Sequence, residues 1–276
     1  MTKQSVFQSI EGRNAIRSFY NGILNMLPIH KKTVATAYGD TFVLEAGDLN
    51  KPTVVLLHGS CSNSAAWLGD MSALASLYHV VAVDIPGEPG NSAEYRLDFQ
   101  SGDHARWLHE TLNALGIAKA AIIGNSMGGW IALQFAAAYP AKVTALGLIA
   151  ASGIVEPSND FIRQVADIDT QKDGMKAVSD TMTAHAALPQ EVLAFMALVT
   201  EHFRPYTGAL CVVTDEQMKH LDMPVLYLAG TGDMTMDVQA AAKRLTALVP
   251  HAKLVLQEGS HIITASAQHI IPFLMQ

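Results

Sequence analysis

Ser126 has the neighbours that a catalytic nucleophile requires. It lies in a G-x-S-x-G pattern with Gly124 and Gly128, between strand-forming residues and helix-forming residues. A serine hydroxyl is a weak nucleophile, so it needs a base, a group that orients the base, and donors for the oxyanion that forms. A sharp strand-to-helix turn lifts the hydroxyl off the sheet and points helix N–H groups at the developing charge. The small glycines permit this turn, and the pattern predicts nucleophilic catalysis by Ser126.

The elements that would position this serine are short apolar runs, each followed by glycine or a polar residue. Runs without polar alternation predict strands buried on both faces of a sheet. They are "TVVLLHG" (53–59), "HVVAVD" (79–84), "KAAIIGNS" (119–126), "VTALGLIA" (143–150), "PVLYLAG" (224–230) and "AKLVLQEG" (252–259). Helical patterns lie between them, at 103–116, 127–140 and 237–250. The alternation predicts an α/β fold with a mainly parallel sheet covered by helices on both sides.

Two segments depart from this alternation. "TVATAY" and "TFVLEA", joined at Gly39 and Asp40, predict an antiparallel hairpin at the sheet edge. Residues 153–222 are helical in pattern and too long for an ordinary loop. We predict that residues 153–222 form a helical cap inserted into a core made of residues 1–152 and 223–276.

The composition limits the partners. Half of the 276 residues are hydrophobic, 16% are charged, and the formal net charge is −7. Since no basic run occurs, nucleic acid and anionic membranes are not expected partners. The two cysteines, Cys61 and Cys211, lie far apart, which argues against a disulfide framework or zinc cluster and favours a reducing compartment.

The sequence lacks several motifs that would indicate a location or a cofactor. Glu11, Arg13 and Arg17 interrupt the first thirty residues before any long apolar run develops, so neither a signal peptide nor a membrane span is expected. We therefore expect a cytoplasmic protein. The sequence contains no P-loop, no H-E-x-x-H and no G-x-G-x-x-G, and we expect no metal ion or other cofactor.

Several motifs, taken in order, resemble the α/β-hydrolase superfamily over nearly the whole chain outside the cap. "LLHGS" resembles its oxyanion loop, and "VDIPGEPGNS" its D-x-P-G-x-G-x-S turn, although one residue longer. "LAGTGD" resembles the loop that supplies the acid, and "QEGSHII" the loop that supplies the histidine. The resemblance implies a mainly parallel sheet of roughly eight strands. It also implies a catalytic triad of Ser126, Asp233 and His261 in the family's order.

The resemblance further implies that the backbone N–H groups of Ser60 and Met127 form the oxyanion hole. Three other residues, Asp237, His269 and His58, are not expected to belong to the triad. Asp237 heads a predicted helix, where a carboxylate interacts favourably with the helix dipole. His269 ranks second to His261 as the base, and His58 is expected to brace its loop rather than to react.

Three functions are compatible with these residues. The first is hydrolysis of small carboxylic esters through an acyl-Ser126 intermediate, and this is the function that we predict. The second is carbon–carbon bond hydrolysis of a diketone-type acid. The motif "GNSMGG" with Asn125 resembles the carbon–carbon bond hydrolases of the superfamily, although this chain lacks the Gly-Pro-Gly that is typical of their oxyanion loop. The third is a signalling receptor that retains the triad and binds ligand with little turnover.

The predicted cap gives some indication of the substrate. Methionine and phenylalanine side chains in or beside it, which adapt to apolar ligands, indicate a small-molecule apolar ester; they are Phe161, Met175, Met182, Phe195, Met196, Phe203, Met218 and Met223. The same side chains could simply pack the cap on the core. Arg163 and Arg204 could meet a substrate carboxylate, or could lie on the surface.

Overall fold

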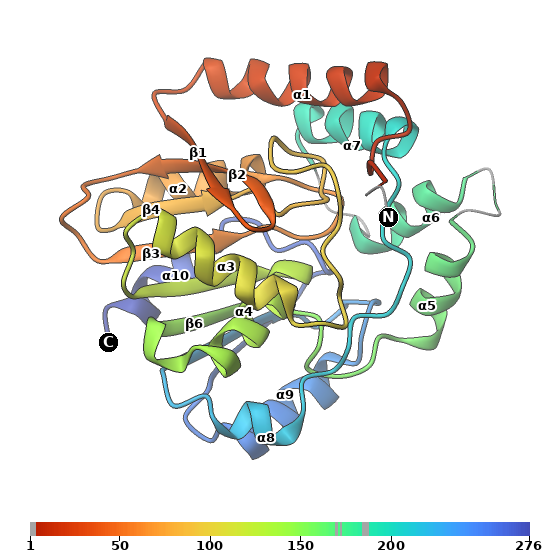
Figure 1. Ribbon diagram of the computed structural model, residues 1–276. Helices are drawn as coiled ribbons and strands as arrows, with labels where there is room; N and C mark the ends of the chain where they lie inside the picture. Colours follow the sequence, from red (N-terminus) through yellow and green to blue (C-terminus); the bar gives the residue numbers. More distant parts are fainter. Residues whose placement is uncertain (1–3, 169–170, 172, 184–187) are drawn as a thin grey trace.

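The computed structural model describes residues 4–168, 171, 173–183 and 188–276, which surround one sheet of eight strands (Figure 1). The strand order is β1-β2-β4-β3-β5-β6-β7-β8. The bounds are β1 His30–Thr36, β2 Gly39–Ala46, β3 Thr53–Leu57, β4 His79–Val83, β5 Ala120–Asn125, β6 Val143–Ile149, β7 Val225–Gly230 and β8 Lys253–Gln257. Strands β1 and β2 form the predicted hairpin, β2 is antiparallel to β4, and the other pairings are parallel. The predicted mainly parallel sheet is confirmed.

Helices cover both faces of the sheet because the central strands bury side chains on both sides. In β3, Val55 and Leu57 join one apolar cluster, and Val54 and Leu56 join another. The first cluster lies under α3 (Asp103–Ala114), α4 (Met127–Ala138), α8 (Asp215–Lys219) and α9 (Val238–Leu248). The second lies under α1 (Ile10–Asn25), the short helix Ser64–Trp67, α2 (Leu68–Leu74) and α10 (Ala267–Leu274). The expectation that every run is buried on both faces is wrong for β8, which is half-buried because it is an edge strand.

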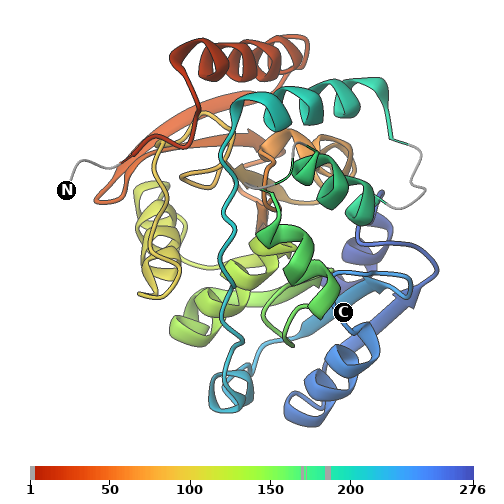
Figure 2. The same cartoon turned by 90° about the vertical axis from the view of Figure 1, so that its right-hand side faces the viewer.

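Helix α1 is an element that the sequence patterns did not predict. The Ser9 side chain caps its start by accepting the N–H of Gly12 at 3.0 Å. Its apolar residues Ile16, Tyr20 and Leu24 are buried at four-residue spacing, as expected for one face of a helix. Helix α1 packs along α7 (Gln190–His202), and the two run side by side in both views (Figures 1 and 2).

The segment 153–222 carries α5 (Asn159–Ala166), α6 (Gly174–Thr183), α7 and α8. Helices α5, α6 and α7 lie together at one end of the molecule, whereas α8 lies against α4 and α9 (Figure 1). Residues 169–170, 172 and 184–187 of this segment are outside the described residues. Within the described part of the chain, no helix is long and apolar enough to cross a membrane.

Candidate active site

Ser126 occupies the turn between β5 and α4, and its backbone is strained. Its φ is +52° and its ψ is −116°, a conformation that residues with side chains rarely adopt. The two glycines of the motif make the turn possible. A Cβ on Gly124 would lie 2.2 Å from the Gly128 carbonyl oxygen, and one on Gly128 would lie 2.3 Å from the Leu57 carbonyl oxygen. Only glycine allows α4 to start this close to β5 and β3.

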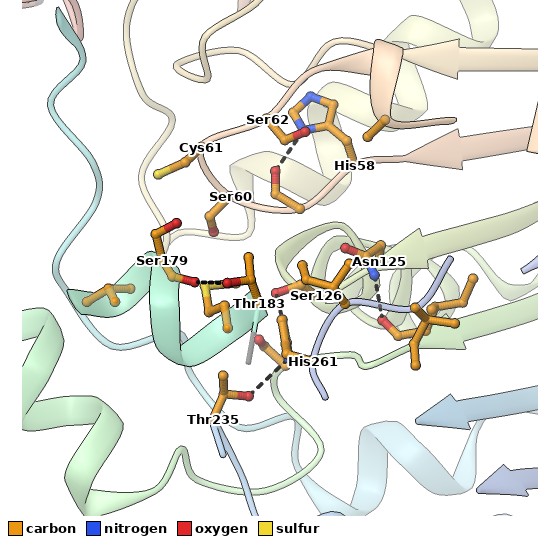
Figure 3. Close-up of a pocket in the computed structure, with 18 of the residues that line it drawn as sticks. His58, Ser60, Cys61, Ser62, Asn125, Ser126, Ser179, Thr183, Thr235 and His261 are labelled. Carbon is orange, nitrogen blue, oxygen red and sulfur yellow. Dashed lines mark hydrogen bonds between the residues drawn. The ribbon is translucent and has the colours of Figure 1, made fainter. Parts of the chain in front are cut away.

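The structure brings Ser126, His261 and Asp233 into one hydrogen-bonded chain (Figure 3 shows the first two). Ser126 Oγ lies 2.9 Å from His261 Nε2, and His261 Nδ1 lies 2.7 Å from Asp233 Oδ2. Asp233 follows β7 and His261 follows β8, so both come from loops at the edge of the sheet where Ser126 also lies. All three residues are buried. This arrangement can pass a proton from the serine to the imidazole and stabilise the resulting imidazolium.

Thr235, which was not among the residues predicted from the sequence, orients the carboxylate of Asp233. Its backbone N–H and its hydroxyl both donate to Asp233 Oδ1, at 2.8 and 2.7 Å. Burial acts to raise the pKa of Asp233, yet the hydrogen bonds from His261 and Thr235 outweigh burial and hold the pKa below its ordinary value. An aspartate that accepts the N–H two residues later is a known turn pattern, so D-x-T was a usable signal.

Asp237 and His269, the alternative candidates for the acid and the base, lie outside this hydrogen-bonded chain. Asp237 caps α9, where its Oδ1 accepts the Ala240 N–H at 2.9 Å. His269 belongs to α10 and is not among the described residues that line the cavity around Ser126.

His58 is fully buried and braces the loop after β3. Its Nε2 accepts the N–H of Ile85 at 2.9 Å, so the ring proton is on Nδ1, which donates to the Gly59 carbonyl at 2.8 Å. Burial lowers the pKa of His58 below its ordinary value. The Ser60 side chain lies across from Ser126 (Figure 3), and Met127 is the first residue of α4. Both predicted oxyanion donors therefore belong to segments that border Ser126.

A cavity of about 1030 Å³ opens above Ser126 and His261. Apolar side chains from the segment 153–222 line it, among them Phe161, Met175, Met182, Phe195 and Met196. Other residues named from the sequence are placed differently. Phe203 packs against Phe7, whereas Met218 and Met223 belong to the main core.

The charge of the cavity wall bears on the substrate. Among the described residues that line it, there is no lysine and no arginine. Arg163 is exposed and pairs with Asp160, and Arg204 donates to backbone carbonyls of residues 5, 7 and 8. The carboxylate of Asp70 reaches the wall and accepts hydrogen bonds from Ser266 and Ala267, at 2.9 and 2.7 Å.

Cys61 lines the cavity, and its backbone φ is +57°. Burial raises the pKa of its thiol, so it is not a thiolate nucleophile at neutral pH. Neither Cys61 nor Cys211 is in a disulfide. Within the described ranges, no group of three or more His, Cys, Asp or Glu side chains is arranged to hold a metal ion.

Comparison with known proteins finds relatives that are similar to most of the chain. A family model described as alpha/beta hydrolase fold matches residues 52–178. The uncharacterized carboxylesterase nap of Bacillus subtilis is 26% identical over 265 residues, 91% of this chain and 88% of the relative. Carboxylesterase YbfK of the same species is 24% identical over 269 residues, 94% and 91% of the two chains.

Solved structures agree on the fold. The crystal structure of carboxylesterase CesB (YbfK) from Bacillus subtilis superposes with a TM-score of 0.88 at 23% identity, covering 96% of this chain and 99% of that one. Naproxen esterase (carboxylesterase NP) from Bacillus subtilis superposes with a TM-score of 0.85 at 24% identity, covering 95% and 98% of the two chains.

Proposed function

This chain is an α/β-hydrolase-fold protein similar to carboxylesterases, and from that premise we propose that it is a serine hydrolase of small carboxylic esters. The observation that carries the proposal is the buried hydrogen-bond chain from Ser126 through His261 to Asp233. Ser126 and His261 line an apolar cavity that is large enough for a small ester.

The reaction would proceed in two halves. Ser126 Oγ attacks the ester carbonyl carbon as His261 Nε2 takes its proton, and the carbonyl electron pair moves to oxygen. The N–H groups of Ser60 and Met127 receive this oxyanion. Collapse expels the alcohol, which takes the proton from His261 and leaves an acyl-serine. Water activated by His261 then attacks the acyl-serine and releases the acid, with Asp233 stabilising the imidazolium in both halves.

We further propose that α5, α6 and α7 act as a cap that supplies the apolar wall of the cavity.

The lining of the cavity favours a neutral substrate. A buried carboxylate without a cationic partner is strongly disfavoured, and the described lining offers neither lysine nor arginine. This argues for esters and against diketone-type acids, although both reactions would use the same triad.

The test compares two p-nitrophenyl esters of equal acyl length, one ending in a methyl group and the other in a carboxylate. We expect kcat/KM to favour the methyl ester by at least about 100-fold, because leaving a charge unpaired in the cavity costs roughly 3 kcal/mol or more. A preference for the carboxylate ester, or turnover of a diketone acid but not of esters, would contradict the proposed substrate.

A fluorophosphonate probe tests the nucleophile in the same preparation. Labelling of the wild type but not of Ser126→Ala is expected. Labelling without turnover of any ester would instead favour the receptor function.

A further inference from the structure

The segment 84–92, which is one residue longer than the family motif it resembles, holds the loop of residues 58–63. We call residues 58–63 the oxyanion loop, because it carries the proposed donor Ser60. Three hydrogen bonds join the two segments: Ile85 N–H to His58 Nε2 at 2.9 Å, Asn63 Nδ2–H to the Pro89 carbonyl at 3.0 Å, and Cys61 N–H to Glu88 Oε2 at 2.6 Å. The third bond is accepted by the buried side chain of Glu88, and burial of a carboxyl group is unfavourable unless an interaction compensates for it.

The peptides on both sides of Ser60 are anchored. The carbonyl of Gly59 accepts the Nδ1–H of His58 at 2.8 Å, and the N–H of Cys61 donates to Glu88. The C=O and N–H of one trans peptide point in opposite directions, so the first bond turns the Ser60 N–H away from His58. Gly59 itself lies against the nucleophile, because a Cβ built on it would be 3.4 Å from Ser126 Cβ. The orientation of the Ser60 N–H therefore depends on both anchors.

The backbone at Cys61 makes the second anchor necessary. Its φ of +57° is in the left-handed region, which a residue with a side chain keeps only when its surroundings hold it. The bond from Cys61 N–H to Glu88 Oε2 is short, at 2.6 Å. Without it, the loop can relax to a more common conformation, and the Ser60 N–H would then move.

Glu88 is poorly explained as a purely structural residue. It is only 4% exposed, and burial raises its pKa to about 7. Arg96 is the cation near it, but no ion pair within 4.0 Å joins the two in the described structure. Instead, the Arg96 guanidinium donates to the Arg204 carbonyl and lies 5.2 Å from the centre of the Phe203 ring. The carboxylate is thus directed at the backbone of the oxyanion loop rather than at a cation.

We propose that Glu88 is a positioning residue for the reaction: by accepting the N–H of Cys61, it fixes the oxyanion loop so that the Ser60 N–H meets the oxyanion. This inference rests on the proposed function. It predicts that the length of the side chain at position 88 matters more than its charge, since the Gln side chain also offers an acceptor oxygen at the same reach.

Three variants separate reach from charge: Glu88→Ala, Glu88→Asp, which keeps the charge but is one methylene shorter, and Glu88→Gln. Each is assayed with an ester and with an alkyl trifluoromethyl ketone, whose carbonyl carbon bonds to Ser126 Oγ while the serine proton passes to His261 and the carbonyl oxygen becomes an oxyanion. The corresponding carbinol has the same chain and forms no adduct, so it reports ground-state binding alone.

We expect Glu88→Ala and Glu88→Asp to lose about 10-fold to 100-fold in kcat and in ketone affinity, within the range known for a lost oxyanion donor. KM and carbinol affinity should stay within about threefold, because the interaction is made in the transition state. Glu88→Gln should stay within about threefold throughout. If Glu88→Ala does not fold, the Asp and Gln variants decide the matter.

The control is Glu94→Gln, since Glu94 bonds to Arg13 and Arg17, both at 3.1 Å, and not to the oxyanion loop. It should keep the wild-type kcat. The proposal is overturned if Glu88→Asp behaves as wild type, if Glu88→Gln is as impaired as Glu88→Asp, or if carbinol and ketone affinities fall together. A ketone adduct that persists in Ser126→Ala would instead refute the proposed nucleophile, whatever the Glu88 variants do.

Discussion

Replacing Asp233 by asparagine should reverse the position of the proton on His261. Thr235 donates to Asp233 Oδ1 through its N–H at 2.8 Å and through its hydroxyl at 2.7 Å. In Asp233→Asn, the amide oxygen must take this position, because the amide nitrogen cannot accept a hydrogen bond. The amide nitrogen then faces His261 Nδ1, which is 2.7 Å from Asp233 Oδ2. It donates to Nδ1, so the imidazole proton must move to Nε2.

The size of the effect follows from this tautomer. With a proton on Nε2, His261 donates to Ser126 Oγ across the 2.9 Å contact and cannot accept the serine proton. The same substitution in a serine protease triad leaves the geometry intact and lowers kcat by about 10⁴. We expect a similar loss, which corresponds to roughly 5 kcal/mol in the activation barrier. KM should change little, since substrate does not contact Asp233 in the proposed mechanism.

The assay is steady-state ester hydrolysis, with thermal unfolding of each variant to verify folding. Asp237→Asn is the matched control: asparagine caps a helix about as well as aspartate, so α9 and turnover should be nearly unchanged. If Asp233→Asn kept kcat within tenfold of wild type, the tautomer argument would be refuted. If Asp237→Asn were the inactive variant, the acid would be Asp237.

Three further predictions concern single positions. Ser126→Ala should abolish fluorophosphonate labelling and ester turnover without loss of folding, and labelling of the variant would refute the nucleophile. Because burial raises the pKa of Glu88 from 4.5 to about 7, the folded state keeps a proton that the unfolded state releases. The unfolding free energy should therefore fall by roughly 3 kcal/mol, relative to Glu88→Gln, as the pH rises from 4.5 to 7; a difference independent of pH in urea titrations would contradict this. Gly128→Ala should cost about 1–3 kcal/mol or more, because its Cβ meets the Leu57 carbonyl, whereas Gly22→Ala, in open space on α1, should stabilise by roughly 0.5–1 kcal/mol. Urea denaturation of the two variants measures both effects.

The sheet could be predicted from the sequence because its strands are buried on both faces and leave continuous apolar runs. The run "AKLVLQEG" shows the limit of this signal. It identifies β8 as a strand but does not tell an edge strand from a central one, since that depends on which neighbour is present. Helix α1 was not predicted, although the four-residue spacing of Ile16, Tyr20 and Leu24 is a usable signal for one buried face of a helix.

Some residues of the candidate site could be predicted from the sequence and others could not. Ser126, Asp233 and His261 each follow a strand in a short motif, and the structure places them in hydrogen-bond contact. Their catalytic roles remain a prediction for the variants above to test. The contact between Glu88 and Cys61 joins residues 27 positions apart and depends on how two loops cross. No local pattern in the sequence encodes such a contact.

The packing of α1 has a consequence for biosynthesis. The C-terminal half of this helix buries Tyr20 and Leu24 against early strands. In its N-terminal half, Ile16 joins a separate cluster with Val6 and Phe7, which precede the helix, and with Val199 and Phe203. At 5–20 residues per second, a ribosome needs roughly 10–40 s to translate the chain between these partners. During that interval, the N-terminal half of α1 has no partner to pack against, and Ile16 stays exposed to solvent or to a chaperone. The second half of α1 can therefore pack as soon as the first strands pair, whereas the first half packs only after α7 has been translated.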